Sequence, residues 1–165
     1  MKENDKKFEL SENETYGFFE INTTGETTGN MYMGKFKVLT VLDPEQKLAA
    51  GREYRALLGP NPAYASDLEA NLAFAIAQLK YRMVEAAPFW NGGRLKDENI
   101  ILEVLDKSLA VELYYRDEIK KRSENNLKKI QEHFVKMQEQ AKKAKEEADK
   151  DPEDVLNEED GDEQR

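Results

Sequence analysis

The side chains that could do chemistry are few in this sequence, and they form no familiar catalytic pattern. His133 is the only histidine and the chain has no cysteine, so a triad or metal site that needs these residues lacks its second member. Gly25, Gly29 and Gly34 are too scattered for a phosphate-binding loop. The acidic residues near the C-terminus lack the glycine and asparagine spacing of a calcium loop. We therefore expect no catalytic residue, no metal, no cofactor and no enzymatic activity.

Composition argues against several other function classes. The 165 residues carry a formal net charge of -9, whereas non-specific nucleic-acid binding needs an excess of Lys and Arg. The basic stretch from Lys120 to Lys145 has few interleaved aromatics and is more typical of a solvated helix face. No segment has the apolar length of a signal peptide or of a membrane span. We expect a soluble cytoplasmic protein with no membrane partner and no nucleic-acid partner.

The elements that must position any binding residues are organised around the stretch from Ser66 to Glu85. Ser66 and Glu69 have the spacing of a capping box, in which each side chain accepts a backbone hydrogen bond from the other residue. Apolar residues then recur at intervals of three and four, which predicts a helix with one apolar stripe. The stripe consists of Leu68, Leu72, Ile76, Leu79 and Met83. Neighbouring segments or another chain must cover it.

Three segments precede this central helix. Residues 1–14 are charged and aperiodic, and we expect a flexible arm. Apolar residues lie on both sides of a centre rich in Thr and Gly between positions 15 and 41, and those from Tyr32 to Val41 follow a period of two, which predicts a β-hairpin. A helix is expected from Asp43 to Leu58, with a capping box at its start and a Gly-Pro stop after it.

A connector and a long third helix follow. Phe89 and Trp90 lie in the connector, where both could complete the core or Trp90 could form a binding anchor. Asp97 is expected to cap the third helix, whose apolar face narrows beyond Tyr115. The narrower pattern has two apolar positions in seven, which is typical of a coiled coil. Its members are Leu127, Ile130, Phe134, Met137, Ala141, Ala144 and Ala148.

Together these patterns predict an α+β protein that is mainly helical. We expect a helical bundle with a small N-terminal β-hairpin, and a long C-terminal helix that extends as a coiled coil into a disordered acidic tail. The expected divisions are a flexible arm at 1–14, a helical domain at 15–118, a basic extension at 119–149 and the tail at 150–165. The apolar surface exceeds what one small domain can cover, so we also expect a homo-oligomer.

In plan, residues 35–118 resemble the tail assembly chaperones of long-tailed, siphovirus-type phages. A short β element, GKFKVLTVLDPEQ, leads into a helix ending RALLGPNP, then into LEANLAFAIAQLKYRMVEAAP with PFW, and finally into a helix with ELYYRDEI. The resemblance implies a small, mostly helical, non-enzymatic protein of the host cytoplasm. It also implies that the protein binds the apolar tape measure protein and keeps it soluble during tail morphogenesis, with the tail tube protein as a second partner.

We expect the partner to bind in a groove lined by the helices Asp43–Leu58 and Ser66–Glu85. The candidate residues are large side chains near segment ends or off the main stripe: Tyr54, Leu58, Phe74 and Trp90. For Phe74 and Trp90, completion of the core is an equally good interpretation. The alternative function is that of a virion structural or connector protein, which would act through the coiled coil from Leu127 to Ala148.

Overall fold

The chain divides into two compact units, residues 1–119 and residues 120–165. The computed structural model describes residues 8–148, and the side chains of residues 8–145. The acidic tail expected at 150–165 therefore lies outside the described residues, as do the first seven residues of the expected arm. The first unit combines an antiparallel sheet with helices, which confirms the α+β class.

A four-stranded antiparallel sheet, in the order β1-β2-β3-β4, stands where the sequence predicts a hairpin alone. Its centre is the predicted hairpin, formed by β2 (Tyr16–Thr24) and β3 (Met31–Leu39). Side chains alternate along both strands between a buried and a more exposed face, as the period of two predicts. The large buried members are Phe19, Ile21, Phe36 and Val38.

Two short edge strands differ from the sequence prediction. β1 (Glu9–Leu10) falls in the segment expected to be a flexible arm; it pairs with β2, and Leu10 packs against the core. β4 (Met83–Glu85) falls in the last turn of the predicted central helix, but it pairs with β3. The prediction of a flexible arm is therefore wrong at Glu9–Leu10, and the prediction of a helix is wrong at Met83–Glu85. In both places the open edge of the hairpin supplies backbone partners that local periodicity does not reveal.

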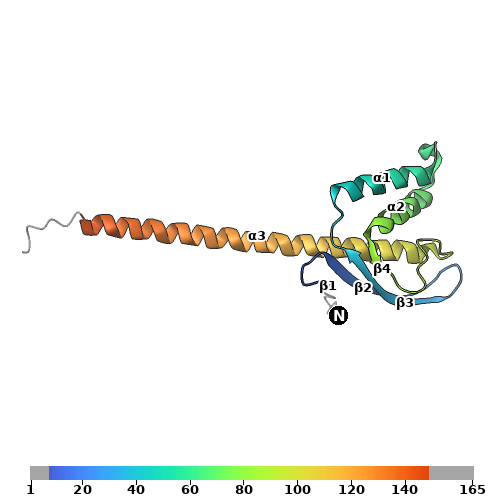
Figure 1. Cartoon of the computed structure of the whole chain (residues 1–165), viewed down its shortest axis with the longest axis horizontal. Coiled ribbons are helices and arrows are strands. Elements are labelled where there is room, and N and C mark those ends of the chain that lie inside the picture. The colour runs from blue at the N-terminus through green and yellow to red at the C-terminus, as the bar shows by residue number, and fades with distance from the viewer. Residues whose placement is uncertain (1–7, 149–165) are drawn as a thin grey trace, which may run out of the picture. The chain divides into compact units, whose positions relative to one another are not determined.

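α1 (Pro44–Leu58) and α2 (Asp67–Arg82) form an antiparallel pair (Figure 1), joined by a link that contains a 3-10 turn at Pro62–Tyr64. Both predicted capping boxes are present, because the cap side chain and the N3 side chain each accept the expected hydrogen bond. Gly59 ends α1 with a φ of 75°, which only glycine adopts readily.

α3 (Glu98–Ala148) is one continuous helix of 51 residues. Asp97 stands immediately before it, where the sequence predicts a cap, but its buried carboxylate binds the β2–β3 turn instead. Oδ1 accepts the backbone N–H groups of Thr27 and Thr28 at 2.8 Å, and Oδ2 accepts the hydroxyls of Thr28 and Tyr32. Gly25 permits this approach, because a Cβ there would lie 2.2 Å from Asp97 Cγ.

The electrostatics of Asp97 follow from these contacts. Burial alone would raise the pKa of its carboxyl, but the hydrogen bonds from Thr28, Tyr32 and Thr27 outweigh that effect and lower the pKa to about 2. The charged carboxylate thus ties the start of α3 to the hairpin turn. The role is structural, and it differs from the predicted helix cap.

The core lies between one face of the sheet, α2 and the part of α3 within the first unit (Figure 1), so it is not the helical bundle expected from the sequence. α3 contributes much of the apolar face that its sequence predicts, but Leu113, four residues after Leu109 on the helix, is 64% exposed. The buried side chains that α3 contributes to the cluster are Ile100, Ile101, Val104, Leu105 and Val111. From α2 the buried members are Ala75 and Leu79, and the half-buried Leu72 and Ile76 pack against the cluster.

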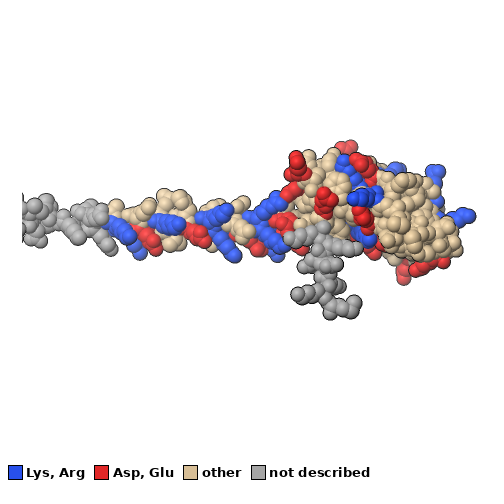
Figure 2. Space-filling view, turned by 90° about the horizontal axis from the view of Figure 1, so that it is seen from below, with Lys and Arg blue, Asp and Glu red and all other residues tan. Residues whose placement is uncertain are grey.

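The C-terminal part of α3, from Lys120 onward, belongs to the second unit. Every described side chain from Lys120 to Lys145 is exposed, including the members of the predicted apolar seam from Leu127 to Ala144. Lysine and glutamate side chains alternate there with uncharged ones (Figure 2), and His133 lies on this exposed surface. The coiled coil itself stays a prediction.

Candidate functional site: an apolar trough beside α2

α1 lies close to α2 because the facing residues of α2 are small. Ala73 and Ala77 are buried, and Ala50 is the one buried residue of α1. Lys80 of α2 pairs with Glu53 of α1 at 2.9 Å, which bridges the two helices near one end. α1 therefore contributes little to the core, and its remaining apolar side chains are available to line a surface feature.

Two adjoining grooves follow α2, and together we call them the trough. The first has a volume of about 430 Å³ and the second of about 570 Å³. Leu57 and Ile76 line both grooves, so the two lie next to each other. The other apolar side chains of the first groove are Leu58, Tyr64, Ala65, Leu72 and Ala73. Those of the second are Leu79, Met83 and Trp90.

The length of the trough suits a helical ligand. On α2 its lining runs from Glu69 to Lys80, which at 1.5 Å per residue spans about 17 Å, or about three helical turns. The turn at Gly92-Gly93 closes on α2 at the second groove; a Cβ on Gly93 would lie 3.0 Å from Ile76 Cγ1. An amphipathic helix of about eleven residues would fit a trough of this length.

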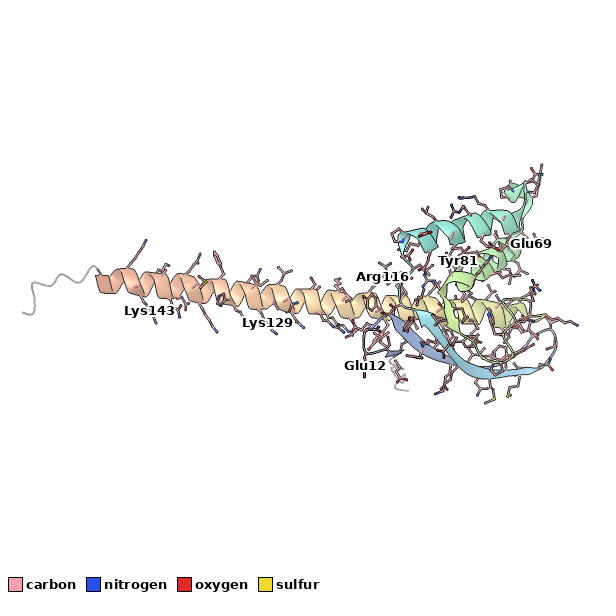
Figure 3. All side chains as sticks on the ribbon, in the orientation of Figure 1. Glu12, Glu69, Tyr81, Arg116, Lys129 and Lys143 are labelled. Carbon is pink, nitrogen blue, oxygen red and sulfur yellow. The ribbon has the colours of Figure 1, made fainter. Side chains whose placement is uncertain are left out.

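Polar and charged side chains also line the trough: Asn61 and Glu69 in the first groove, and Glu53, Lys80, Asn91 and Arg94 in the second. Glu69 lies at the beginning of α2 (Figure 3), where hydrogen bonds from Ser66 lower the pKa of its carboxyl. The Glu53 carboxylate raises the pKa of Lys80, mainly through their hydrogen bond. Both shifts favour the charged forms. A lining that combines apolar with polar and charged side chains is common at protein-protein interfaces.

The four residues predicted to bind the partner fall into two groups. Leu58 lines the first groove and Trp90 the second. Trp90 is half-buried and stands edge-on to Phe36, with ring centroids 5.9 Å apart, so it also helps to complete the core. Tyr54 and Phe74 contact each other edge-on, at 6.0 Å, and are not among the residues that line the trough. Their part in partner binding stays a prediction.

The predicted stripe of the central helix serves both the core and the trough. Leu72, Ile76 and Met83 belong to this stripe; they are half-buried, pack against the core cluster and line the trough. Leu68, the first residue of the stripe, is 49% exposed. The signal that could have found the trough is the width of the apolar surface on α2, which exceeds the area that one sheet face and one helix can cover.

Comparison with models of protein families, with curated proteins and with solved structures finds no match to this chain. Among residues 8–148, no helix is long and apolar enough to cross a membrane. Any functional interpretation therefore depends on the site itself and on the resemblance in plan noted above.

Proposed function

We propose that the protein is a non-enzymatic tail assembly chaperone of a long-tailed phage. In this proposal it binds an apolar helical segment of the tape measure protein in the trough. It acts in the host cytoplasm and keeps that partner soluble until the tail tube, its second candidate partner, assembles. The observation that carries the proposal is the trough, two adjoining grooves that follow α2 for about three helical turns and are lined by apolar and charged side chains.

The chemistry of the partner matches this channel. A tape measure protein is long, helical and apolar, so an isolated segment would aggregate unless another surface covered its apolar stripe. The trough offers leucine, isoleucine and an edge of Trp90 to such a stripe, at positions that are already half-exposed. A net charge of -9 on the chaperone would keep the complex in solution.

A second function has its own support in the exposed seam of the second unit. Ile130 and Phe134 are 65% and 62% exposed, and large apolar side chains at that spacing usually face another helix. A virion structural or connector protein would bind its partner through this seam, and the trough would then be incidental.

Substitution in the trough tests the first proposal. Leu57 lines both grooves and is 46% exposed. Leu57→Asp therefore puts a charge in the trough and should change the packing of the core little. The matched control is Leu48→Asp on the same helix, because Leu48 is 67% exposed and lies outside the trough lining. Each variant is co-expressed with the tape measure protein of the same phage, and the soluble fraction of that partner is measured.

We expect Leu57→Asp to weaken retention of the partner by about tenfold or more, as for a central interface residue. Leu48→Asp should retain the partner as the wild type does, and both variants should keep the wild-type melting temperature. Equal retention by the two variants would contradict the proposal, since the trough would then make no contact with the partner.

A further inference from the structure

The exposed seam of the second unit has a heptad register that can be assigned residue by residue. The apolar residues follow one another at steps of three and four, so Leu127, Phe134 and Ala141 take position a. Position d is taken by Ile130, Met137 and Ala144. The four large members are between 55% and 65% exposed, so nothing in the described part of the chain covers this face.

The positions that flank the seam are almost free of charge. Position e holds Glu124, Gln131, Gln138 and Lys145, and position g holds Asn126, His133 and Gln140. The many lysines fall mainly at b and c, on the outer side; Lys129 and Lys143, both at c, are labelled in Figure 3. Two identical helices could therefore approach along this seam without like-charge repulsion at its centre.

The two charged flanking residues indicate the direction of pairing. Glu124 and Lys145 are opposite in sign and stand at opposite ends of the seam. In a parallel pair both would face an uncharged residue, because e faces the g residue five positions earlier: Ile119 for Glu124 and Gln140 for Lys145. In an antiparallel pair e faces e, so each Glu124 would meet Lys145 of the other copy, which gives two ion pairs for each dimer.

Side-chain volume indicates the same direction. The seam narrows from Leu and Ile at its beginning to Ala at its end. Antiparallel pairing centred between Phe134 and Met137 places Leu127 opposite Ala144 and Ile130 opposite Ala141. The outer layers then combine a large with a small side chain, whereas at the centre Phe134 meets Met137. A parallel pair would instead stack alanine on alanine over its last two layers, where little apolar area could be buried.

We infer that the segment from Glu124 to Lys145 pairs with the same segment of a second copy as an antiparallel coiled coil. Its orientation is set by two Glu124–Lys145 ion pairs. The inference concerns the second unit alone and does not depend on the chaperone proposal. The partner is a second copy because only an identical chain supplies both the taper and the complementary charge at the matching positions.

Charge exchange in the full-length chain tests this directly. Glu124→Lys leaves lysine at both ends of the seam, and Lys145→Glu leaves glutamate at both ends. By sedimentation equilibrium at low salt, each variant alone should dimerise about tenfold more weakly than the wild type, since two attractive pairs become repulsive. An equimolar mixture of the two variants should recover the wild-type dissociation constant.

The matched control exchanges charges on the outer face. Glu132→Lys and Lys143→Glu, at positions f and c, change the net charge by the same amounts but face away from the seam. Each of these variants, and their mixture, should dimerise with the dissociation constant of the wild type. The inference is overturned if the wild type is monomeric at about 100 μM, or if mixing Glu124→Lys with Lys145→Glu does not restore dimerisation. It is also overturned if the two control variants weaken dimerisation alone and recover it when mixed.

Because the chain has no cysteine, single introduced cysteines can report the relative direction of the two helices. Chains carrying Ile130→Cys and Ala141→Cys are mixed and oxidised. Antiparallel pairing predicts a disulfide between the two different chains. Preferential cross-linking of Ile130→Cys to itself would mean a parallel pair and would overturn the inference.

Discussion

Removal of the Glu112 carboxylate should destabilise the first unit more than any surface substitution. Glu112 on α3 accepts a hydrogen bond from Arg82, which ends α2 and is only 4% exposed. Its other oxygen accepts from Arg116, one turn further along α3. The remaining contact of Arg82 is a longer bond from Nε to Gln78, and within the described residues Nη1 is buried with no hydrogen-bond partner. Glu112 is therefore the main counter-charge of a buried guanidinium.

The size of the effect follows from this burial. The Glu112 side chain is 12% exposed, so Glu112→Ala leaves the Arg82 charge in the interior without its partner. Loss of one partner of a buried pair costs about 3–5 kcal/mol in the free energy of unfolding. The other arginine provides the matched control. The Arg116 side chain is 55% exposed, so Arg116→Ala should cost about 1 kcal/mol or less.

Urea unfolding followed by circular dichroism measures both values. A third variant, Arg82→Met with Glu112→Leu, removes both charges and should be clearly more stable than Glu112→Ala alone. The reasoning would be refuted if Glu112→Ala lost less than about 1 kcal/mol, or if the double variant were the less stable of the two.

Two further predictions concern what holds the first unit together. Leu79 is 2% exposed in the core, so Leu79→Ala should lower the free energy of unfolding in urea by about 2–5 kcal/mol. Lys142→Ala on the exposed extension should change it little. A larger loss for Lys142→Ala than for Leu79→Ala would contradict the place of Leu79 in the core. The pKa of Asp97 is lowered from 3.8 to about 2, so its contribution to stability is present above pH 3.8 and is lost as the pH falls through about 2. Unfolding midpoints measured from about pH 5 to about pH 2 should fall less steeply for Asp97→Asn than for the wild type, and parallel curves would count against the role of this carboxylate.

Local signals in the sequence predicted those parts of the fold that local physics determines. The capping boxes at Asp43 and Ser66 depend on residues three positions apart, and the alternation along β3 depends on the pleat of one strand. Both were predicted correctly. The strand at Met83–Glu85 was predicted as helix, because its partner β3 lies more than 40 residues away and supplies the backbone hydrogen bonds.

The candidate site was predicted less completely than the fold, for the same physical reason. Leu58 and Trp90 were expected in the groove and line the trough, but Ile76 lines both grooves and was not among the expected groove residues. Periodicity shows which side of a helix is apolar and does not show how much of that side its neighbours cover. Asp97 is a similar case, since no local pattern indicates that its carboxylate binds a turn some 70 positions earlier.

The central claim is that the trough, and not the C-terminal seam, binds the apolar partner. The most direct test of this claim compares how tightly two full-length variants bind the tape measure protein. The variants are Leu57→Asp in the trough and Phe134→Asp in the seam, where Phe134 is 62% exposed. Each purified variant is titrated with the same helical segment of the tape measure protein, and the dissociation constant is measured by calorimetry. The account predicts about tenfold weaker binding or more for Leu57→Asp and wild-type binding for Phe134→Asp. Weak binding by Phe134→Asp together with wild-type binding by Leu57→Asp would contradict it.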